Sequence, residues 1–286
     1  IAQALIEAGA DVNKSDNEGR TPLYWGCLNG HLDIVKALIA AGADKDESDR
    51  EDGCGLTPLA CACVSKESRL DIVKVLIKAG ADLNEPDDSG RTPLIWTCLN
   101  DHFDIARALI EAGADLNEAD DKERTPLIYA CGSQEGRLDI VKALVEAGAD
   151  LNKTDDKGRT PLFCACQIGR LDIVKVLIAA GADKDASDNE GWTPLIWHCG
   201  VKDGSFDIAK ALIEAGADLN KADNEGRTPL GWACQNCHLD IVKALIAAGA
   251  DINAADNVSG WTPLMMASTV AANEKDAANM QNRANV

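Results

Sequence analysis

Hydrophobic and polar residues follow a pattern that recurs every 33 to 36 residues along the chain. In one clear copy, an apolar stretch covers residues 23–28, and Asn29-Gly30 separates it from a second stretch at residues 32–39. The isoleucine, valine and leucine residues of the second stretch fall on one helical face. Each copy therefore predicts two short helices joined by a turn, and a polar, turn-rich link leads to the next copy.

Two tripeptides mark this repeat and alternate without exception. Thr-Pro-Leu begins at Thr21, Thr57, Thr92, Thr125, Thr160, Thr193, Thr228 and Thr262. Gly-Ala-Asp begins at Gly9, Gly42, Gly80, Gly113, Gly148, Gly181, Gly216 and Gly249. Threonine before proline is a favoured helix start, and glycine is favoured just past a helix end. One such unit cannot bury its own apolar face, so neighbouring units are expected to stack.

The residues around these markers resemble the ankyrin repeat. Asp16 to Leu23 reads Asp-Asn-Glu-Gly-Arg-Thr-Pro-Leu, Asn29 to Val35 reads Asn-Gly-His-Leu-Asp-Ile-Val, and Ala-Gly-Ala-Asp follows. The resemblance covers residues 1 to about 268. It implies an all-α repeat solenoid of antiparallel helix pairs, each with a short β-hairpin finger projecting roughly at right angles. It also implies a concave surface, built from the fingers and first helices, that usually binds protein.

We therefore expect residues 1–286 to form one ankyrin-repeat domain. It comprises a partial repeat at 1–20, repeats starting near 21, 57, 92, 125, 160, 193 and 228, and a partial repeat at 262–286. Residues 1–10 supply a second helix without its first, which predicts a segment of a longer array or missing preceding residues. Residues 273–286 lack the apolar helical pattern, so a degenerate cap or a fraying tail is expected there.

The sequence departs from the ankyrin pattern in three ways. The family's histidine after Thr-Pro-Leu is absent, and apolar packing is expected to substitute for its hydrogen bond. The turn between the helices is two residues longer in every second repeat, at residues 65–69, 133–137 and 201–205, which indicates duplication of a repeat pair. The finger before Thr57 is three residues longer than most and contains Cys54. The position of the missing histidine holds Tyr24, Ala60, Ile95, Ile128, Phe163, Ile196, Gly231 and Met265.

Seven of the 11 cysteines hold one equivalent position in the first helix. Stacked helices lie about 8–10 Å apart, whereas a disulfide needs Cα atoms about 4.4–6.8 Å apart, so we interpret this row as unpaired buried filler. Cys234-Gln-Asn-Cys237-His238 matches the c-type haem attachment string. The repeat register instead places Cys237 at the position of the turn glycine in Asn-Gly-His, and His238 at the position of its histidine. The row is Cys27, Cys63, Cys98, Cys131, Cys166, Cys199 and Cys234.

The chain offers little for catalysis. It has no phosphate loop, serine elbow or paired carboxylates at a cleft, and His198 beside Cys199 lacks the third group that a nucleophilic site needs. We therefore expect no enzymatic activity, no cofactor and no metal.

Charge narrows the class of partner. The net charge of −19 argues against nucleic acid and against anionic membranes, and it is compatible with a basic protein partner. The simpler interpretation is that the acids keep a long array soluble. No stretch reaches the length of a membrane span, so direct membrane insertion is not expected. The many cysteines favour a reducing, cytoplasmic location.

Two rows of residues are the candidate binding positions. One lies four residues after the capping threonine, and the other lies just before it, at the base of the finger. Tryptophan, tyrosine and arginine are enriched at binding hot spots, and arginine stacks on indole rings. The alternative is that the aromatic residues only cover the finger base. The sequence favours neither the binding interpretation nor the packing interpretation. The candidates are Trp25, Trp96, Tyr129, Trp197, Trp232, Arg20, Arg91, Arg124, Arg159, Trp192, Arg227 and Trp261.

The sequence thus predicts a protein-interaction scaffold, a monomer or a segment of a longer array. Its groove would bind a protein or an extended peptide with basic and apolar residues. The alternative function is a spacer or spring segment of a larger, membrane-associated protein. Changing Trp96 and Trp197 to alanine separates binding from packing, because loss of ligand with an intact fold indicates a true groove.

Overall fold

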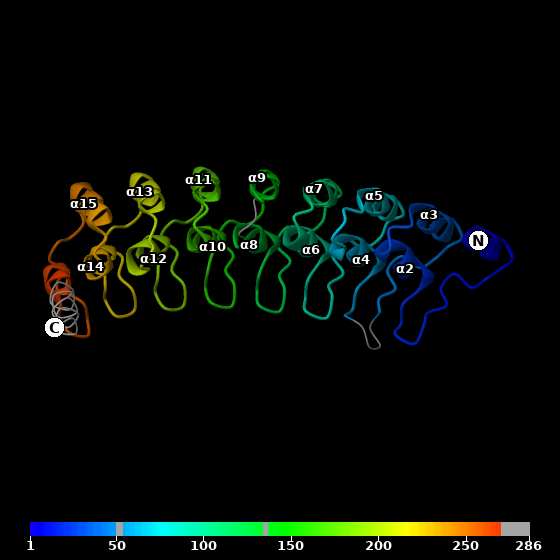
Figure 1. Cartoon of the computed structure of the whole chain (residues 1–286), viewed down its shortest axis with the longest axis horizontal. Helices are drawn as coiled ribbons and strands as arrows, with labels where there is room; N and C mark the ends of the chain where they lie inside the picture. Colours follow the sequence, from blue (N-terminus) through cyan, green and yellow to red (C-terminus); the bar gives the residue numbers. More distant parts are fainter. Residues whose placement is uncertain (50–53, 134–136, 270–286) are drawn as a thin grey trace, which may run out of the picture. The chain divides into compact units, whose positions relative to one another are not determined.

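The computed structural model describes residues 1–49, 54–133 and 137–269. The chain divides into two compact units, Ile1–Asp156 and Lys157–Val286, and each is a row of helix pairs (Figure 1). The first unit contains α1 (Ala2–Glu7), α2 (Pro22–Leu28), α3 (Leu32–Ala40), α4 (Pro58–Val64), α5 (Leu70–Lys78), α6 (Pro93–Asn100), α7 (Phe103–Glu111), α8 (Pro126–Cys131) and α9 (Leu138–Glu146). The second contains α10 (Pro161–Ile168), α11 (Leu171–Ala179), α12 (Pro194–Gly200), α13 (Phe206–Glu214), α14 (Pro229–Gln235) and α15 (Leu239–Ala248), and residues 263–269 are also helical.

The first helices begin as the sequence predicts. In seven repeats the Thr-Pro-Leu threonine is the N-cap residue, and proline takes the first helical position. The threonine Oγ1 accepts a hydrogen bond from the backbone N–H three residues on, at 3.2 Å between Thr21 and Tyr24. That bond satisfies one of the N–H groups that a helix start leaves without an intrahelical partner. The expectation of two helices per repeat is confirmed.

The second helices end at the glycine of Gly-Ala-Asp. Gly42 has φ +85°, the left-handed conformation that glycine adopts without a steric penalty. Its N–H donates to the Ile39 carbonyl at 3.1 Å, and the Ala43 N–H donates to the Leu38 carbonyl at 3.0 Å. This pair of bonds is a Schellman motif, and it turns the chain from the second helix into the finger.

Each unit has two helical layers with the core between them. The first helices of successive repeats contact one another, the second helices do the same, and each first helix contacts its own second helix. Figure 1 shows the two rows, with the fingers on the side of the first helices. Leu59, Leu94 and Ile105 are fully buried in the first unit, as are Leu162 and Ile173 in the second. Because every buried face needs a neighbouring repeat, stability is a property of the stack.

Apolar packing does replace the family's histidine after Thr-Pro-Leu. Ile95 and Ile196 are fully buried at this position, and Phe163 is 1% exposed. The backbone N–H of this residue still donates to the capping threonine in these repeats, at 3.2–3.3 Å. The cap therefore forms without an imidazole.

The fingers differ from the expected β-hairpins, because no β-strand occurs among the described residues. Most of the described fingers close through one short loop, as where the Asp87 N–H donates to the Arg91 carbonyl at 3.0 Å. The Asp87 carboxylate then accepts the N–H groups of Ser89 and Arg91, at 2.8 and 2.9 Å. A side chain thus takes backbone donors that a strand ladder would use.

The long turns at residues 65–69 and 201–205 are each held by the repeat that follows. In the first unit His102 Nε2 lies 2.6 Å from the Ser65 carbonyl oxygen. In the second unit His238 Nε2 lies 2.8 Å from the Val201 carbonyl oxygen, and Asn236 donates to the Cys199 and Gly200 carbonyls at 3.1 and 3.0 Å. The two extra residues therefore present carbonyl groups to the next repeat.

Three expectations fall on residues outside the described ranges. They concern the tail at 273–286, the middle of the long turn at 134–136, and residues 50–53 of the longer finger. In that finger, Cys54 is described and is exposed.

Candidate binding face

The two candidate rows meet where each finger joins its first helix. The aromatic residues lie in the first turns of the first helices, and the arginines lie just before the N-cap threonine. Most of these side chains are half-buried, and Trp25 and Trp261 are the most exposed, at 38% and 42%. The structure therefore brings the two rows together in five repeats, on the finger side of each unit.

In three repeats a finger aspartate accepts hydrogen bonds from both the arginine and the aromatic side chain. Asp120 is buried, and its Oδ2 accepts hydrogen bonds from Tyr129 Oη at 2.6 Å and from Arg124 Nε at 3.0 Å. The Arg124 guanidinium carbon lies 4.6 Å from the centre of the Tyr129 ring. The other carboxylate oxygen of Asp120, Oδ1, accepts the backbone N–H groups of Lys122 and Arg124. One carboxylate thus closes the finger and holds both candidate side chains.

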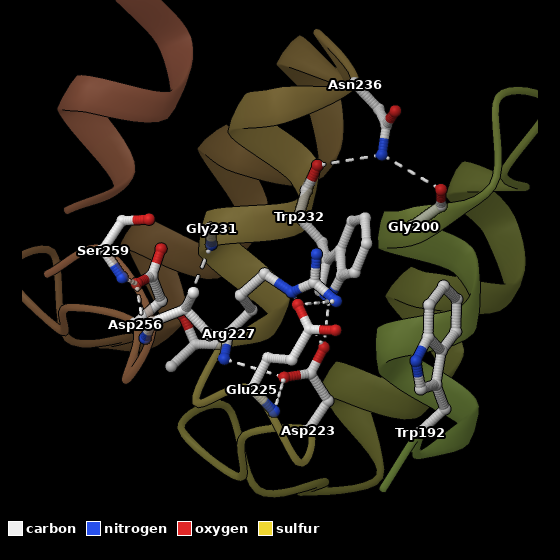
Figure 2. Close-up of polar contacts among 12 residues, drawn as sticks. Trp192, Gly200, Asp223, Glu225, Arg227, Gly231, Trp232, Asn236, Asp256 and Ser259 are labelled. Carbon is white, nitrogen blue, oxygen red and sulfur yellow. Dashed lines mark hydrogen bonds and ion pairs between the residues drawn. The ribbon is translucent and has the colours of Figure 1, made fainter. Parts of the chain in front are cut away.

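The same triad recurs with tryptophan at Asp16 and Asp223. Asp87 also holds Trp96, but no hydrogen bond from the Arg91 side chain to Asp87 is found among the described residues. The indole Nε1–H donates to Oδ2 of Asp16, Asp87 and Asp223, at 3.3, 3.0 and 2.9 Å. Figure 2 shows this arrangement for Asp223, whose carboxylate lies between Arg227 and Trp232. In the sequence, this arrangement corresponds to an aspartate four residues before the arginine and nine residues before the aromatic residue. The guanidinium-to-ring distances are 4.5 Å for Arg20–Trp25, 4.9 Å for Arg91–Trp96 and 3.9 Å for Arg227–Trp232.

The triad of Asp120, Arg124 and Tyr129 shifts the pKa values of its members. Burial alone would raise the pKa of the Asp120 carboxyl, but hydrogen bonds from Arg124, Tyr129 and two backbone N–H groups outweigh it and lower that pKa. Burial together with the Asp120 charge raises the pKa of Tyr129 to about 12. The carboxylate is therefore ionised and the phenol neutral at pH 7, so the triad keeps its hydrogen bonds there.

Two repeats of the second unit break the triad. Where the aromatic position holds Cys164, Arg159 Nη1 donates to Gln167 Oε1 at 3.0 Å. In the next repeat Trp192 replaces the arginine, and its ring centre lies 5.8 Å from Trp197 and 5.0 Å from Trp232. Phe163 extends this aromatic cluster, 5.7 Å from Trp197. At the last finger Trp261 follows Asp256, whose Oδ1 accepts backbone N–H groups such as that of Gly260.

Many of the finger acids are occupied in the fold. The aspartate of Gly-Ala-Asp accepts the N–H two residues on, and its own N–H donates to an Asn or Asp of the preceding repeat. In the first unit the Asp44 N–H donates to Asn13 Oδ1, and the Asp115 N–H donates to Asn84 Oδ1, both at 2.8 Å. In the second unit the Asp251 N–H donates to Asn220 Oδ1 at 2.8 Å. The acids and amides thus form a ladder that joins repeats, as local satisfaction of backbone donors predicts.

The cysteine row is mostly buried, and its cysteines form no disulfide among the described residues. Six of the seven row cysteines are buried, and Cys234 is partly exposed. Burial raises the pKa of Cys27 and of Cys98 to about 12. Thiolates are the reactive form of cysteine, so these side chains act as packing residues at neutral pH.

The Cys234–His238 segment is a repeat turn. Cys237 has φ +59°, in the left-handed region occupied at the equivalent position by Gly30, at +75°. His238 contacts the Val201 carbonyl oxygen through Nε2. The geometry therefore agrees with the assignment of Cys237 to a turn glycine.

His198 is packed inside α12. Its Nδ1 accepts the Ser205 N–H at 3.2 Å, and burial lowers its pKa to about 4, although a backbone hydrogen bond with Cys166 opposes that shift. The neighbouring Cys199 is fully buried. The imidazole is thus neutral at pH 7.

Stacked two-helix repeats with capped fingers define a helical repeat protein. The family model described as "Ankyrin repeats (3 copies)" matches residues 1–87, 66–155, 133–223 and 197–280. The chain therefore belongs to the ankyrin-repeat family. Ankyrin repeats generally serve as protein–protein interaction modules.

Two curated relatives share short segments with the chain. One is YahD of Escherichia coli (strain K12), named as an ankyrin repeat protein, with 39% identity over 56 residues, 20% of this chain and 28% of that protein. The other is "Acyl-CoA-binding domain-containing protein 2" of Arabidopsis thaliana, with 58% identity over 31 residues, 11% of this chain and 9% of that protein. The chain thus spans well under a third of either relative.

The helices that the structure describes are also too short or too polar to cross a membrane.

Proposed function

We propose that this chain is a recognition module that binds a protein partner through the finger side of its first helices. The observation that carries the proposal is the set of half-buried Trp and Tyr rings with stacked arginines on that side. The triads hold these side chains in one conformation before any partner arrives. Rigid aromatic and arginine anchors lose little entropy on binding, which favours them as hot spots.

The charge of the same side indicates the chemistry of the partner. Exposed acids such as Asp88, Asp121 and Glu190 surround the aromatic and arginine residues. An extended peptide with basic residues would meet these acids, and its apolar residues would pack on the rings. The buried cysteines, which form no disulfide among the described residues, support a reducing compartment such as the cytoplasm.

The test compares Trp96→Ala and Trp197→Ala with Trp96→Phe in the full chain. Partner proteins are captured from the native cell, their affinities are measured, and thermal unfolding is followed by circular dichroism. We expect each alanine variant to weaken binding at least about tenfold, the loss of a hot-spot residue. Trp96→Phe keeps an aromatic ring but loses the bond to Asp87, so it should bind better than Trp96→Ala.

Ile246→Ala is the matched control, because Ile246 is 50% exposed on α15, in the layer of second helices. Binding should be unchanged in this variant. If both tryptophan variants bind normally and only lower the unfolding temperature, the aromatic row is structural and the proposal is wrong.

A spacer or spring within a larger protein is the second candidate function. The hydrogen bonds that join successive repeats within each unit favour it, including the Asp–Asn ladder and the Asn236 bonds to Cys199 and Gly200. Stretching a single molecule tests it. A spring extends and recovers reversibly, repeat by repeat, whereas irreversible unfolding in one step would contradict this function.

A further inference from the structure

We propose that Asp188 and Trp197 form a binding site for an arginine side chain of the partner protein. This inference rests on the proposed function and assigns one position on the finger side of the second unit, together with the chemical group that it receives. The observations that carry it come from comparing the repeat that starts at Thr193 with the other repeats of the same chain.

In four repeats the chain's own arginine occupies this position. Its guanidinium carbon lies 3.9–4.9 Å from the ring centre of the aromatic residue, and the carboxylate of the same finger accepts a hydrogen bond from that aromatic residue. Planar guanidinium groups both stack on rings and pair with carboxylates, which a lysine ammonium does less well. The fold therefore already contains an arginine site, repeated in both units.

The repeat that starts at Thr193 has the carboxylate and the ring but lacks the arginine. Trp192 stands in its place. Asp188 Oδ1 accepts the N–H groups of Glu190 and Trp192, at 3.0 and 2.8 Å, as in the other fingers. Neither Asp188 Oδ2 nor the Trp197 indole N–H has a hydrogen-bond partner among the described residues. Asp188 is also more exposed than Asp223, which is buried in its complete triad.

Trp192 takes over only part of the role of the missing arginine: its ring contacts Trp197, 5.8 Å between centres, but its side chain makes no hydrogen bond to Asp188. Its ring lies over Gly200, where a Cβ atom would be 2.8 Å from the indole, so the glycine provides the room for this ring. The ring then packs against Trp232, 5.0 Å between centres. Figure 2 shows Trp192 beside Trp232, on the side of Gly200. Trp192 thus extends toward the following repeat and offers Asp188 no side-chain hydrogen bond.

A cleft gives access to the incomplete site. It has a volume of about 350 Å³, and its lining includes Asp188, Glu190, Trp197 and Phe163. Arg159 also lines the cleft, but its guanidinium is hydrogen-bonded to Gln167 at 3.0 Å. An incoming arginine side chain would lie on the Trp197 ring and donate to Asp188, while Glu190 adds a second negative charge. Trp197 and Asp188 thus supply the ring and the carboxylate that the internal arginines use.

The probe is N-acetylarginine methylamide, added to the ¹⁵N-labelled full chain and followed through the indole N–H signals in NMR spectra. Trp197→Phe assigns the signal of interest. We expect that signal to shift saturably with the arginine probe, to shift several-fold more weakly with N-acetyllysine methylamide, and to stay in place with the neutral citrulline analogue. The lysine probe thus tests whether a planar group is needed, and the citrulline probe tests whether a positive charge is needed.

Two variants test the site itself. Asp188→Asn keeps an Oδ1 acceptor for Glu190 and Trp192 and removes the charge, and we expect the affinity to fall roughly tenfold. Trp192→Arg restores the arginine of the other repeats, so the internal guanidinium should fill the site and abolish the shift. Asp121→Asn is the matched control, because it removes one exposed finger charge in the first unit, and it should bind like the wild type. Circular dichroism checks that each variant is folded.

The inference is wrong if the Trp197 signal does not respond to arginine. It is also wrong if folded Asp188→Asn and Trp192→Arg respond as the wild type does. The proposed function fails separately, through the Trp96→Ala and Trp197→Ala comparison. A chain that loses its partner on Trp96→Ala but ignores the arginine probe would retain the proposed function and lose only this site.

Discussion

At the scale of single residues, the fold uses polar side chains to complete backbone hydrogen bonding. Each finger aspartate accepts backbone N–H groups with one carboxylate oxygen, as Asp223 does for Glu225 and Arg227. Four of these aspartates use the other oxygen to hold an aromatic residue. The acids of the fingers therefore do more than keep the chain soluble. His198 is a buried side chain that titrates near neutral pH when exposed and is held neutral here.

His198 predicts how the stability of the chain depends on pH. In the unfolded chain a histidine titrates near about pH 6.5, whereas burial lowers the pKa of folded His198 to about 4. Below about pH 6.5 the unfolded chain therefore binds a proton that the folded chain does not. The free energy of unfolding should fall by about 3 kcal/mol between about pH 6.5 and pH 4, the equivalent of that shift.

Urea unfolding at several pH values measures this dependence, and His198→Thr supplies the comparison. Thr97 holds the equivalent position in an earlier repeat and is buried there, so threonine suits this place on the helix. The variant should lose most of the slope between pH 6.5 and pH 4, whatever its stability at pH 7. Equal slopes in the two proteins would show that His198 is not held neutral by the fold.

At the scale of elements, the sequence predicts the helices well and the connections less well. Thr-Pro-Leu and Gly-Ala-Asp carry their own capping chemistry, so helix ends follow from local sequence, as Thr21 and Gly42 show. The fingers do not become strands, because aspartate carboxylates take the donors of a hairpin ladder. That outcome depends on side-chain geometry which residue spacing does not specify.

The candidate rows show the same limit. Spacing placed Trp96 and Arg91 at the base of one finger, and the structure stacks them 4.9 Å apart. The sequence does not predict their link through Asp87, because each finger has several aspartates and the spacing does not show which of them accepts these hydrogen bonds. The gap at Asp188 was also missed, since it appears only when the hydrogen bonds of several repeats are compared.

The longer turns give a prediction at this scale. Asn236→Ala removes the donor to the Cys199 and Gly200 carbonyls at the end of α12. We expect a loss of about 1–2 kcal/mol in the free energy of unfolding, about 1 kcal/mol for each bond. Urea unfolding measures the total, and amide hydrogen exchange should show faster opening in residues 199–205.

Asn29→Ala is the matched control for Asn236→Ala. Asn29 holds the same position in an earlier repeat, but it is exposed, and no side-chain hydrogen bond is found for it among the described residues. Its replacement should change stability by less than about 0.5 kcal/mol, as for an ordinary surface position. Equal losses in the two variants would mean that helix propensity, and not the bond to the long turn, sets the cost.

At the scale of the whole molecule, an array of repeats adds acidic fingers without adding a compensating basic surface. The chain carries 47 acidic residues against 28 lysines and arginines, so the net charge is −19. Ion pairs do not offset the excess of acidic residues. An arginine such as Arg227 already pairs with two acids, Asp223 and Glu225. Like charges on neighbouring fingers therefore oppose the folded state, which holds them close together.

Salt should consequently stabilise the fold. Raising NaCl from about 10 mM to about 300 mM shortens the screening length from about 30 Å to under about 8 Å. We expect the unfolding temperature, followed by circular dichroism, to rise by several degrees. Glu118→Lys reverses one exposed loop charge and should raise the unfolding temperature at low salt but change it little at high salt. An unfolding temperature that falls with NaCl would mean that the exposed ion pairs, including Arg107–Glu111 at 2.7 Å, stabilise the array more than its net charge destabilises it.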